Sequence, residues 1–395
     1  MTYDFDSITP RRATGCVKWD STEADDVLPL WVADMDFQAA PCIREALQRR
    51  LDHGVFGYTR VTEQYYDSII RWFGQRHGWT LQRPWIQYTT GVVPAISCIV
   101  KALTMPGDRV IVATPVYNCF FTCIRNNGCE VAEVPLLISQ DGTYRMDWEG
   151  FEQACADEKA VAFILCNPHN PGGRTWTPDE LARIGNLCRQ HGVTVISDEI
   201  HNEIVMPGNH YTPFASLSDD NQQCSVTCIS PSKSFNIAGL QMACIVCSDP
   251  TLSRRIDRAI NINEVCDVNP FAPVATIAAY TPEGAEWLEQ MNAYVYENYR
   301  YLQTFLQQQP LPFTLMPLQA TYLAWVDMSQ LCQRLSCNSE ELEQRLINEA
   351  HIYFNAGSHY GTAGEHFMRI NLACPRAILV EACQRFAQFI AATYA

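Results

Sequence analysis

The sequence predicts an α/β protein that consists of a large domain, with a mainly parallel sheet flanked by helices, and a smaller α+β domain. Two observations support this fold class. Between about residues 85 and 250, short apolar runs alternate with helix-like segments. After about residue 280 the pattern changes to long polar helix-like stretches around one strand-like run.

Five apolar runs form the predicted sheet of the large domain. None of them alternates cleanly between apolar and polar residues, which is typical of strands buried on both faces, as in a parallel sheet. They cover residues 109–115, 160–168, 193–199, 225–230 and 242–249.

The segment between the second and third runs, TPDELARIGNLCRQHG, carries helix signals at both ends. Thr177 can cap the helix and Pro178 fits its first position. Glu180 completes a capping box, and Gly192 ends the helix. Strand, helix and strand in this order form a βαβ unit, and in such sheets the ligand site lies at the carboxyl ends of the strands.

The C-terminal part begins with a long helix-like stretch at 284–309, and the strand-like ATYLAWVDM follows at 320–328. A further helix-like segment comes next. We expect these elements to form the smaller domain. The predicted division is residues 1–45 for an N-terminal segment that joins the small domain, 46–280 for the large domain and 281–395 for the small domain.

Charge and hydropathy exclude several classes of partner. The formal net charge of −15 argues against nucleic acid, whose binding needs a clustered basic face. No apolar run is long enough for a transmembrane helix, and the start MTYDFDSITPRR lacks the features of a secretory signal. We therefore expect a cytoplasmic protein without a membrane partner.

The 18 cysteines are scattered along the chain. The single CxxC pair, Cys244 and Cys247, lies in an apolar run that is typical of a buried strand, and no His partner stands at zinc-finger spacing. We expect no metal site. The cysteines are most simply small apolar core residues in a reducing cytoplasm.

Four polar clusters fall at the ends of predicted strands, and the first three have a purely structural alternative. CNPHNPGGR (166–174) contains Asn170 and is also a typical turn sequence. SDEIHNE (197–203) places Asp198 after a strand, where a carboxylate can simply cap a helix. YTTGVVPAI (88–96) opens a helix at Gly91, and every helix start offers free backbone N–H groups.

The fourth cluster, CISPSKSFNIAGL (228–240), has Lys233 as its single charged residue. A solvated surface lysine is the ordinary interpretation. However, only four of the 28 basic residues are lysines, so the chain uses arginine for most of its positive charge. Unlike a guanidinium, a lysine ammonium can lose its proton and become a nucleophile.

One ligand fits all four clusters. A phosphate suits the helix start, a basic ring nitrogen suits Asp198, and an aldehyde suits Lys233. Pyridoxal 5′-phosphate has all three groups, together with a ring hydroxyl for Asn170. The carboxylate keeps the ring nitrogen protonated, so that the ring can accept electrons from a substrate carbanion.

The chain resembles fold-type I pyridoxal-phosphate enzymes of the class I/II aminotransferase superfamily over nearly its whole length, which implies their large domain with a seven-stranded sheet. In this resemblance, SPSKSF supplies Lys233 as the covalent cofactor link, with Ser230 and Ser232 beside it as phosphate or structural contacts. NPHNPGGR supplies Asn170 for the phenolic oxygen, and SDEIH supplies Asp198 for the pyridine nitrogen.

Three more segments extend the resemblance. Tyr117 in TPVYNCFF corresponds to an aromatic residue that stacks on the cofactor, and Arg369 in MRINLACPR to the arginine that binds the substrate's α-carboxylate. Tyr58 in HGVFGYTR corresponds to a tyrosine that reaches the phosphate of the neighbouring subunit. The resemblance therefore implies a homodimer with shared active sites.

Two positions depart from the usual aminotransferase pattern. His201 stands where a tyrosine is usual, and Gln241 stands where an arginine usually binds the phosphate. With WVADMDF (31–37), these departures resemble the cystathionine β-lyase and cystalysin-like branch. Without the arginine, the backbone N–H groups of Val92 and Val93 are expected to contribute more to phosphate binding, together with Ser230 and Tyr58.

This branch implies a carbon–sulfur β-lyase that acts on a small amino-acid substrate and gives pyruvate, ammonia and a thiol, with Lys233 as catalytic base and Tyr117 assisting. An aminotransferase is the alternative enzyme. A regulatory protein that keeps the cofactor for structure alone is the alternative from another class, and the presence of Lys233, Asp198 and Arg369 counts against it.

Overall fold

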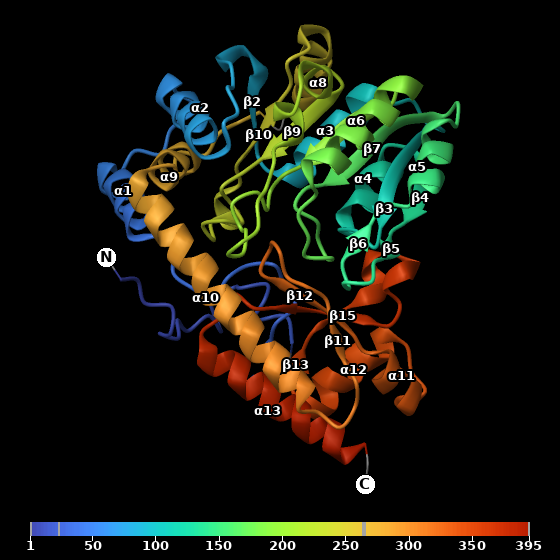
Figure 1. Cartoon of the computed structure of the whole chain (residues 1–395). Coiled ribbons are helices and arrows are strands. Elements are labelled where there is room, and N and C mark those ends of the chain that lie inside the picture. Colours follow the sequence, from blue (N-terminus) through green and yellow to red (C-terminus); the bar gives the residue numbers. More distant parts are fainter. Residues whose placement is uncertain (1, 23, 263–265, 394–395) are drawn as a thin grey trace.

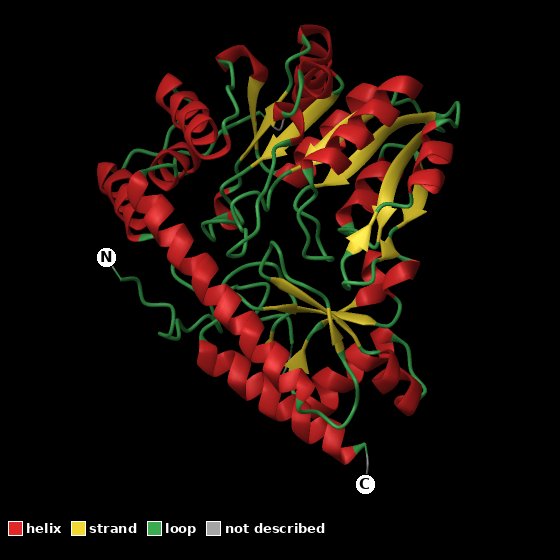
Figure 2. Ribbon diagram, viewed as in Figure 1, coloured by secondary structure: helices red, strands yellow, loops and turns green. Residues whose placement is uncertain are grey.

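The computed structural model describes residues 2–22, 24–262 and 266–393. Two groups of strands lie apart in the molecule, one in its upper half and one in its lower half as drawn (Figures 1 and 2). The long helix α10 (Pro282–Gln307) begins beside the helices of the upper group and extends along the lower group (Figure 1).

A seven-stranded sheet forms the centre of the large domain. Its spatial order is β2-β10-β9-β8-β7-β3-β4. All adjacent pairs are parallel except the two that involve β10. The strands are β2 (Ile86–Thr89), β3 (Arg109–Thr114), β4 (Glu130–Pro135), β7 (Ala160–Cys166), β8 (Thr194–Asp198), β9 (Ser225–Ile229) and β10 (Ala243–Val246).

All five predicted runs are strands of this sheet, so the predicted fold class is confirmed. The interpretation of the run at 242–249 needs a correction, because β10 is antiparallel to both of its neighbours. An internal strand that is covered on both faces has the same apolar pattern in either direction. Two strands lie outside the predicted runs, and one of them, β4, is a half-exposed edge strand.

Helices cover both faces of the sheet. Val110 and Val112 of β3 pack with α3, α4 and α8, whereas Ile111 packs on the opposite face with α5 and α6. The predicted capping box of Thr177 and Glu180 is present at the start of α6. The helices of this part are α1 (Pro41–His53), α2 (Glu63–His77), α3 (Val92–Leu103), α4 (Cys119–Asn126), α5 (Trp148–Cys155), α6 (Pro178–His191), α7 (Asp219–Gln223), α8 (Pro250–Ile262) and α9 (Ala272–Ala279).

The C-terminal part contains a four-stranded sheet of order β11-β12-β15-β14, in which all pairs are antiparallel. The predicted long helix corresponds to α10, and the predicted strand-like run contains β12. The elements after α10 are β11 (Thr314–Leu315), β12 (Leu323–Asp327), α11 (Ser329–Leu335), α12 (Ser339–Ala350), β13 (Ile352–Tyr353), β14 (Asn355–Ala356), β15 (Phe367–Asn371) and α13 (Arg376–Ala392).

The N-terminal segment contacts this C-terminal part. Strand β1 (Leu28–Pro29) pairs with β13, and the Asp36 amide donates to the carbonyl of Ala373 at 2.8 Å. The domain boundaries at residues 45 and 280 stay predictions. The remaining two-stranded sheet, formed by β5 (Leu137–Ile138) and β6 (Tyr144–Arg145), lies beside the large sheet (Figure 1). Within the described residues, none of the helices has the length and apolar character needed to cross a bilayer.

Candidate active site

The carboxyl ends of three adjacent strands meet at one cavity of about 190 Å³. Asn170 follows β7, Asp198 is the last residue of β8, and Lys233 follows β9. Because these strands are parallel neighbours, their ends lie at the same edge of the sheet. Eight predicted site residues line the cavity: Val92, Val93, Tyr117, Asn170, Asp198, His201, Ser232 and Lys233.

Lys233 is held by a backbone oxygen. Its Nζ donates to the Ala33 carbonyl at 2.6 Å. Burial lowers the pKa of Lys233 to about 8, against the opposing effect of the negative charge of Asp34. The positive charge of Arg369 lowers this pKa further. A substantial fraction of the side chain is therefore a neutral amine near pH 8, and a neutral amine can attack an aldehyde or accept a proton.

Asp198 is a buried carboxylate whose charge is only partly compensated. Burial raises its pKa to about 7, although the Ile200 amide donates to Oδ1 at 3.1 Å and Lys233 contributes a positive charge. A protonated pyridine nitrogen would supply the missing opposite charge. The carboxylate therefore fits the predicted role of binding the cofactor's ring nitrogen.

His201 lies in the same cavity as a neutral ring. Burial, together with the positive charges of Lys233 and Arg369, lowers its pKa to about 3. Its Nδ1 is buried without a hydrogen-bond partner, and its ring stands edge-on to Tyr322 with the ring centroids 6.1 Å apart. An imidazolium here would add a positive charge next to Lys233, whereas the neutral imidazole adds none.

Arg369 lies in β15 of the C-terminal part and contacts Asn170, which lines the cavity. Its Nη1 donates to Asn170 Oδ1 at 3.2 Å, and its Nη2 donates to the Trp31 carbonyl at 2.8 Å. The guanidinium lies over the Tyr360 ring, 4.9 Å from the centroid. Its Nε is buried without a partner, so a donor remains for a carboxylate, as the predicted role requires.

The predicted phosphate end is the start of α3. Val92 and Val93 occupy its first two positions, where backbone N–H groups have no partner within the helix. Ser232 lines the cavity here, but Ser230 does not. The Ser230 hydroxyl donates to the Met242 carbonyl at 2.6 Å and accepts the Ser232 amide at 3.1 Å, so its contacts are structural. Gln241 is exposed.

The two predicted tyrosines differ in position. Tyr117 follows β3 and lines the cavity, and burial raises the pKa of its hydroxyl well above the usual value. Tyr58 is fully exposed, at 105%, and does not line the cavity of its own chain. Of the predicted residues, Ser230, Tyr58 and Arg369 do not line the cavity of one chain, and Arg369 joins the site through its hydrogen bond to Asn170.

Several contacts of the site fall outside the predicted residues. The Ala33 carbonyl accepts both Lys233 Nζ and the Tyr322 hydroxyl, and the Trp31 carbonyl accepts Arg369. The motif WVADMDF marks this segment in the sequence, but the motif does not show that its backbone oxygens bind site residues. Among the described residues there is no group of three His, Cys, Asp or Glu side chains that could hold a metal ion.

The family model for aminotransferases of class I and II matches residues 25–386. The match covers most of the sequence, and the chain therefore belongs to this family. The predicted superfamily is confirmed, and the fold and the cavity at the carboxyl edge of the sheet agree with it.

Several similar proteins are named as carbon–sulfur lyases. Cystathionine β-lyase PatB of Bacillus subtilis is 42% identical over 97% of this chain and 98% of its own length. Cystalysin of Treponema denticola, whose structure contains pyridoxal 5′-phosphate, is 33% identical with a TM-score of 0.93, covering 98% of both chains. The C–S lyase of Staphylococcus hominis, also bound to this cofactor, is 31% identical with a TM-score of 0.92, covering 98% of this chain and 99% of its own.

Lys233 is expected to be the residue that binds the cofactor covalently, because its amine faces the cavity with a lowered pKa. Borohydride reduction followed by peptide mass spectrometry should find the cofactor on Lys233 in the native chain. The Lys233→Ala variant should carry no covalent cofactor, whereas Lys101→Ala should be labelled normally. Recovery of the label on Lys18, Lys101 or Lys159 would contradict the assignment.

Replacement of Asp198 by alanine is expected to lower the turnover rate by about a hundredfold or more, because the charge that stabilises the protonated cofactor ring is lost. Steady-state kinetics at saturating cofactor measure the effect. Asp220→Asn, on the exposed side of α7, removes a carboxylate remote from the cavity and serves as control. An Asp198→Ala enzyme with near-native turnover would remove this residue from the reaction.

Proposed function

We propose that this protein is a pyridoxal-phosphate-dependent carbon–sulfur β-lyase, which converts an S-substituted cysteine and one water molecule to pyruvate, ammonia and a thiol. The observation that carries the proposal is that Lys233 and Asp198 line one cavity, while Arg369 is hydrogen-bonded to Asn170 in the lining of the same cavity. The predicted cofactor and enzyme class agree with PatB and with the cofactor-bound lyases of the same fold.

The substrate's α-carboxylate binds at Arg369, whose unpartnered Nε provides a donor. Asn170 and the Trp31 carbonyl hold the guanidinium in place, so that the carboxylate meets a fixed planar group. The stacking of this guanidinium on Tyr360 restricts it further. The carboxylate contact thus sets the position of Cα relative to Lys233.

Lys233 transfers the proton. Lys233 would hold the cofactor, and its neutral amine, favoured by the lowered pKa, would remove the proton from Cα. When bound, the cofactor supplies an electron-accepting ring in conjugation with the substrate nitrogen, which stabilises the negative charge left at Cα. Asp198 keeps that ring protonated at its nitrogen, because a negative charge in a buried site favours the charged form of its partner.

The thiol leaves from Cβ. A thiol with an ordinary pKa near 8.5 is a far better leaving group than an alcohol, so elimination competes well with reprotonation when sulfur is present. The neutral His201 and the protonated Tyr117 are both in the cavity. Tyr117 carries a hydroxyl proton that it can donate by hydrogen bonding to a departing group.

The purified protein is expected to convert L-cystathionine and other S-substituted cysteines to equal amounts of pyruvate and thiol without any added keto acid. Serine, with its poorer leaving group, should react much more slowly. Coupled assays for pyruvate and free thiol measure both products. Efficient amino-group exchange between alanine and a keto acid, without thiol from any cysteine conjugate, would instead establish the aminotransferase alternative.

We infer that the active form is a homodimer whose sites are completed by Tyr58 of the neighbouring subunit. Support comes from an exposed apolar stretch at the end of α1 and beyond it: Leu51, Val55 and Phe56 are 52%, 63% and 52% exposed, and Tyr58 is fully exposed. Contiguous apolar surface of this kind is typical of a contact between proteins.

Mixing inactive Tyr58→Phe and Lys233→Ala chains is expected to restore part of the activity, because a hybrid dimer contains one site with neither substitution. Subunit exchange is verified by mass spectrometry of the mixed dimer. Mixing Lys233→Ala with Asp198→Ala, two lesions in the same cavity, is the matched control. Absence of recovery after verified exchange would count against a shared site.

We propose a cytoplasmic location. Cys244 and Cys247, the single CxxC pair, are buried and free. Free thiols of this kind suit a reducing compartment. The net charge of −15 agrees with a small-molecule substrate rather than a nucleic acid.

A further inference from the structure

The loop of residues 31–37 presents two backbone oxygens to the site. The Ala33 carbonyl accepts Lys233 Nζ at 2.6 Å and the Tyr322 hydroxyl at 2.9 Å. The Trp31 carbonyl accepts Arg369 Nη2 at 2.8 Å. One short loop therefore contacts both the reactive amine and the carboxylate-binding guanidinium. A shift of this loop would alter both contacts at once.

Four charged side chains form an ion cluster at this loop, the N-terminal ion cluster. Asp34 and Asp36 belong to the loop, and Arg11 and Lys18 pair with them. Lys18 Nζ lies 2.8 Å from Asp36 Oδ2, and their side chains are only 1% and 2% exposed. Arg11 lies 2.5 Å from Asp34 and 2.7 Å from Asp36. Two positive charges thus balance two negative charges, as a buried cluster requires.

The cluster also bonds the backbone of the loop. Lys18 Nζ donates to the Asp34 carbonyl at 3.3 Å, and Arg11 Nη1 donates to the Met35 carbonyl at 2.9 Å. The indole of Trp19 donates to Asp36 Oδ1 at 2.7 Å. The ion pairs therefore fix the path of the chain as well as the two carboxylates.

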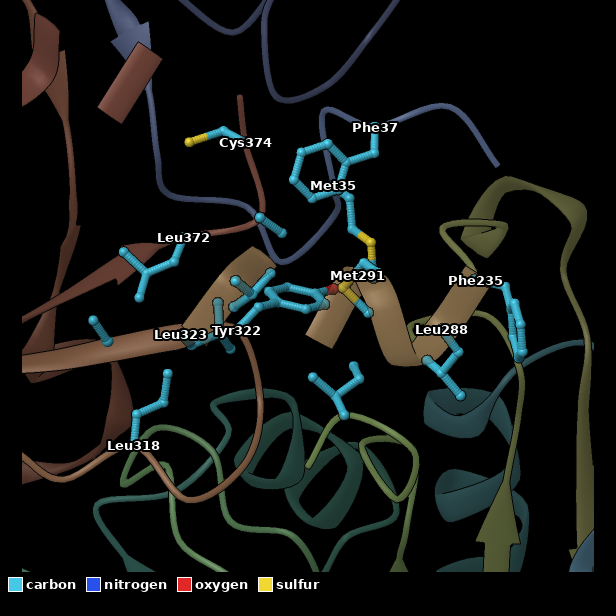
Figure 3. Close-up of a cluster of buried hydrophobic side chains, with 14 of the residues drawn as sticks. Met35, Phe37, Phe235, Leu288, Met291, Leu318, Tyr322, Leu323, Leu372 and Cys374 are labelled. Atoms are coloured by element: carbon cyan, nitrogen blue, oxygen red, sulfur yellow. The ribbon is translucent and has the colours of Figure 1, made fainter. Parts of the chain in front are cut away.

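Uncharged contacts tie the loop to the neighbours of the two site residues. Asn236 Nδ2 donates to the Met35 and Phe37 carbonyls, and Asn371 Nδ2 donates to the Val32 and Asp34 carbonyls. Asn236 comes three residues after Lys233, and Asn371 comes two residues after Arg369. The side chains of Met35 and Phe37 belong to the same apolar core as Met291 (Figure 3).

We propose that the Lys18–Asp36 pair is a positioning element of the active site, which holds the loop of residues 31–37 so that the Ala33 carbonyl orients Lys233 and the Trp31 carbonyl orients Arg369. This role rests on the proposed lyase function and assigns a task to two residues that do not line the cavity. The pair acts through the backbone, because hydrogen bonds to a carbonyl weaken steeply when their direction changes.

Stability alone is a poor reason for such a pair. Replacing a buried ion pair by apolar side chains of similar volume is often neutral for folding, whereas removing one partner leaves a costly unpaired charge. A fixed pair does resist movement, since separating Lys18 from Asp36 would leave both charges uncompensated in the interior. The two roles can therefore be separated experimentally by removing both charges together.

The decisive variant is Lys18→Met/Asp36→Leu in the full-length chain, compared with each single substitution. Arg109→Met is the matched control, because Arg109 pairs with Glu130 and Asp157 at the start of β3, the end of that strand remote from the cavity. Thermal unfolding of all variants measures stability. The double variant is expected to be more stable than either single variant.

The first readout is the pH dependence of Lys233 acylation in the cofactor-free chain, followed by peptide mass spectrometry. The native midpoint is expected at about 8. In the double variant the midpoint should fall by about half a unit or more, because the ammonium loses its carbonyl acceptor and the field of Asp34. Asp198, Arg369 and Cys119 also act on Lys233 and are not substituted in this variant. Displacement of Arg369, whose positive charge lowers this pKa, would offset part of the fall. This readout requires neither cofactor nor substrate.

The second readout is the KM for an S-substituted cysteine in the cofactor-loaded enzyme. A roughly tenfold or larger increase is expected in the double variant, because a misplaced Arg369 binds the carboxylate less well. Arg109→Met should keep the native KM and the native Lys233 midpoint. Should the double variant not fold, Trp19→Phe removes one neutral hydrogen bond to Asp36, and smaller shifts in the same directions are expected.

Native values of both KM and the Lys233 midpoint in the folded double variant would overturn the positioning role, as would unchanged values in Trp19→Phe when the double variant is unfolded. Equal shifts in Arg109→Met would also overturn it, because general destabilisation would then explain them. Absence of pyruvate formation by the native enzyme would contradict the proposed lyase function alone, since the acylation midpoint does not depend on that reaction.

Discussion

Parallel pairing of β7, β8 and β9 is the constraint on which the site depends. Their register places Cys166 beside Asp198, and Asp198 beside Cys228. All three strands therefore end at one edge, and the chain leaves each strand there in a loop whose side chains face the same cavity. Helices on both faces keep the sheet buried, so the side chains at this edge are withdrawn from bulk water.

This withdrawal from water sets the chemistry of the site. Burial lowers the pKa of Lys233 from 10.5 to about 8, which corresponds to ~3 kcal/mol against the ammonium form. The same burial raises the pKa of Asp198 to about 7 and lowers that of His201 to about 3. Burial thus shifts the pKa values of the Lys233 amine and the Asp198 carboxyl toward neutral pH, and it keeps the His201 imidazole uncharged. Such clusters of perturbed groups are typical of active sites.

The C-terminal part completes the site from outside the large sheet. Arg369 lies in β15, nearly 200 residues from Asn170 in sequence, and the two side chains are hydrogen-bonded to each other. The loop of residues 31–37 lies between the two parts and contacts Arg369 and Lys233. The substrate-binding charge and the reactive amine therefore share one backbone support, which couples the position of one to that of the other.

The sequence by itself determined the local elements and the identity of the chemistry. The apolar runs, the capping box of α6 and the four strand-end clusters are short-range patterns. The pairing of Lys233 with Asp198 follows from what those side chains can do, whereas the role of Arg369 was implied by the family resemblance. Only the tertiary structure decided the antiparallel direction of β10, the structural use of the Ser230 hydroxyl, and the support of the site by Ala33, Trp31 and Tyr322. An apolar pattern indicates that a strand is buried but not whether it runs parallel or antiparallel to its neighbours. A backbone carbonyl is the same chemical group in every residue, so the sequence does not show which carbonyl binds a site residue. Its partner is fixed only by how distant segments pack.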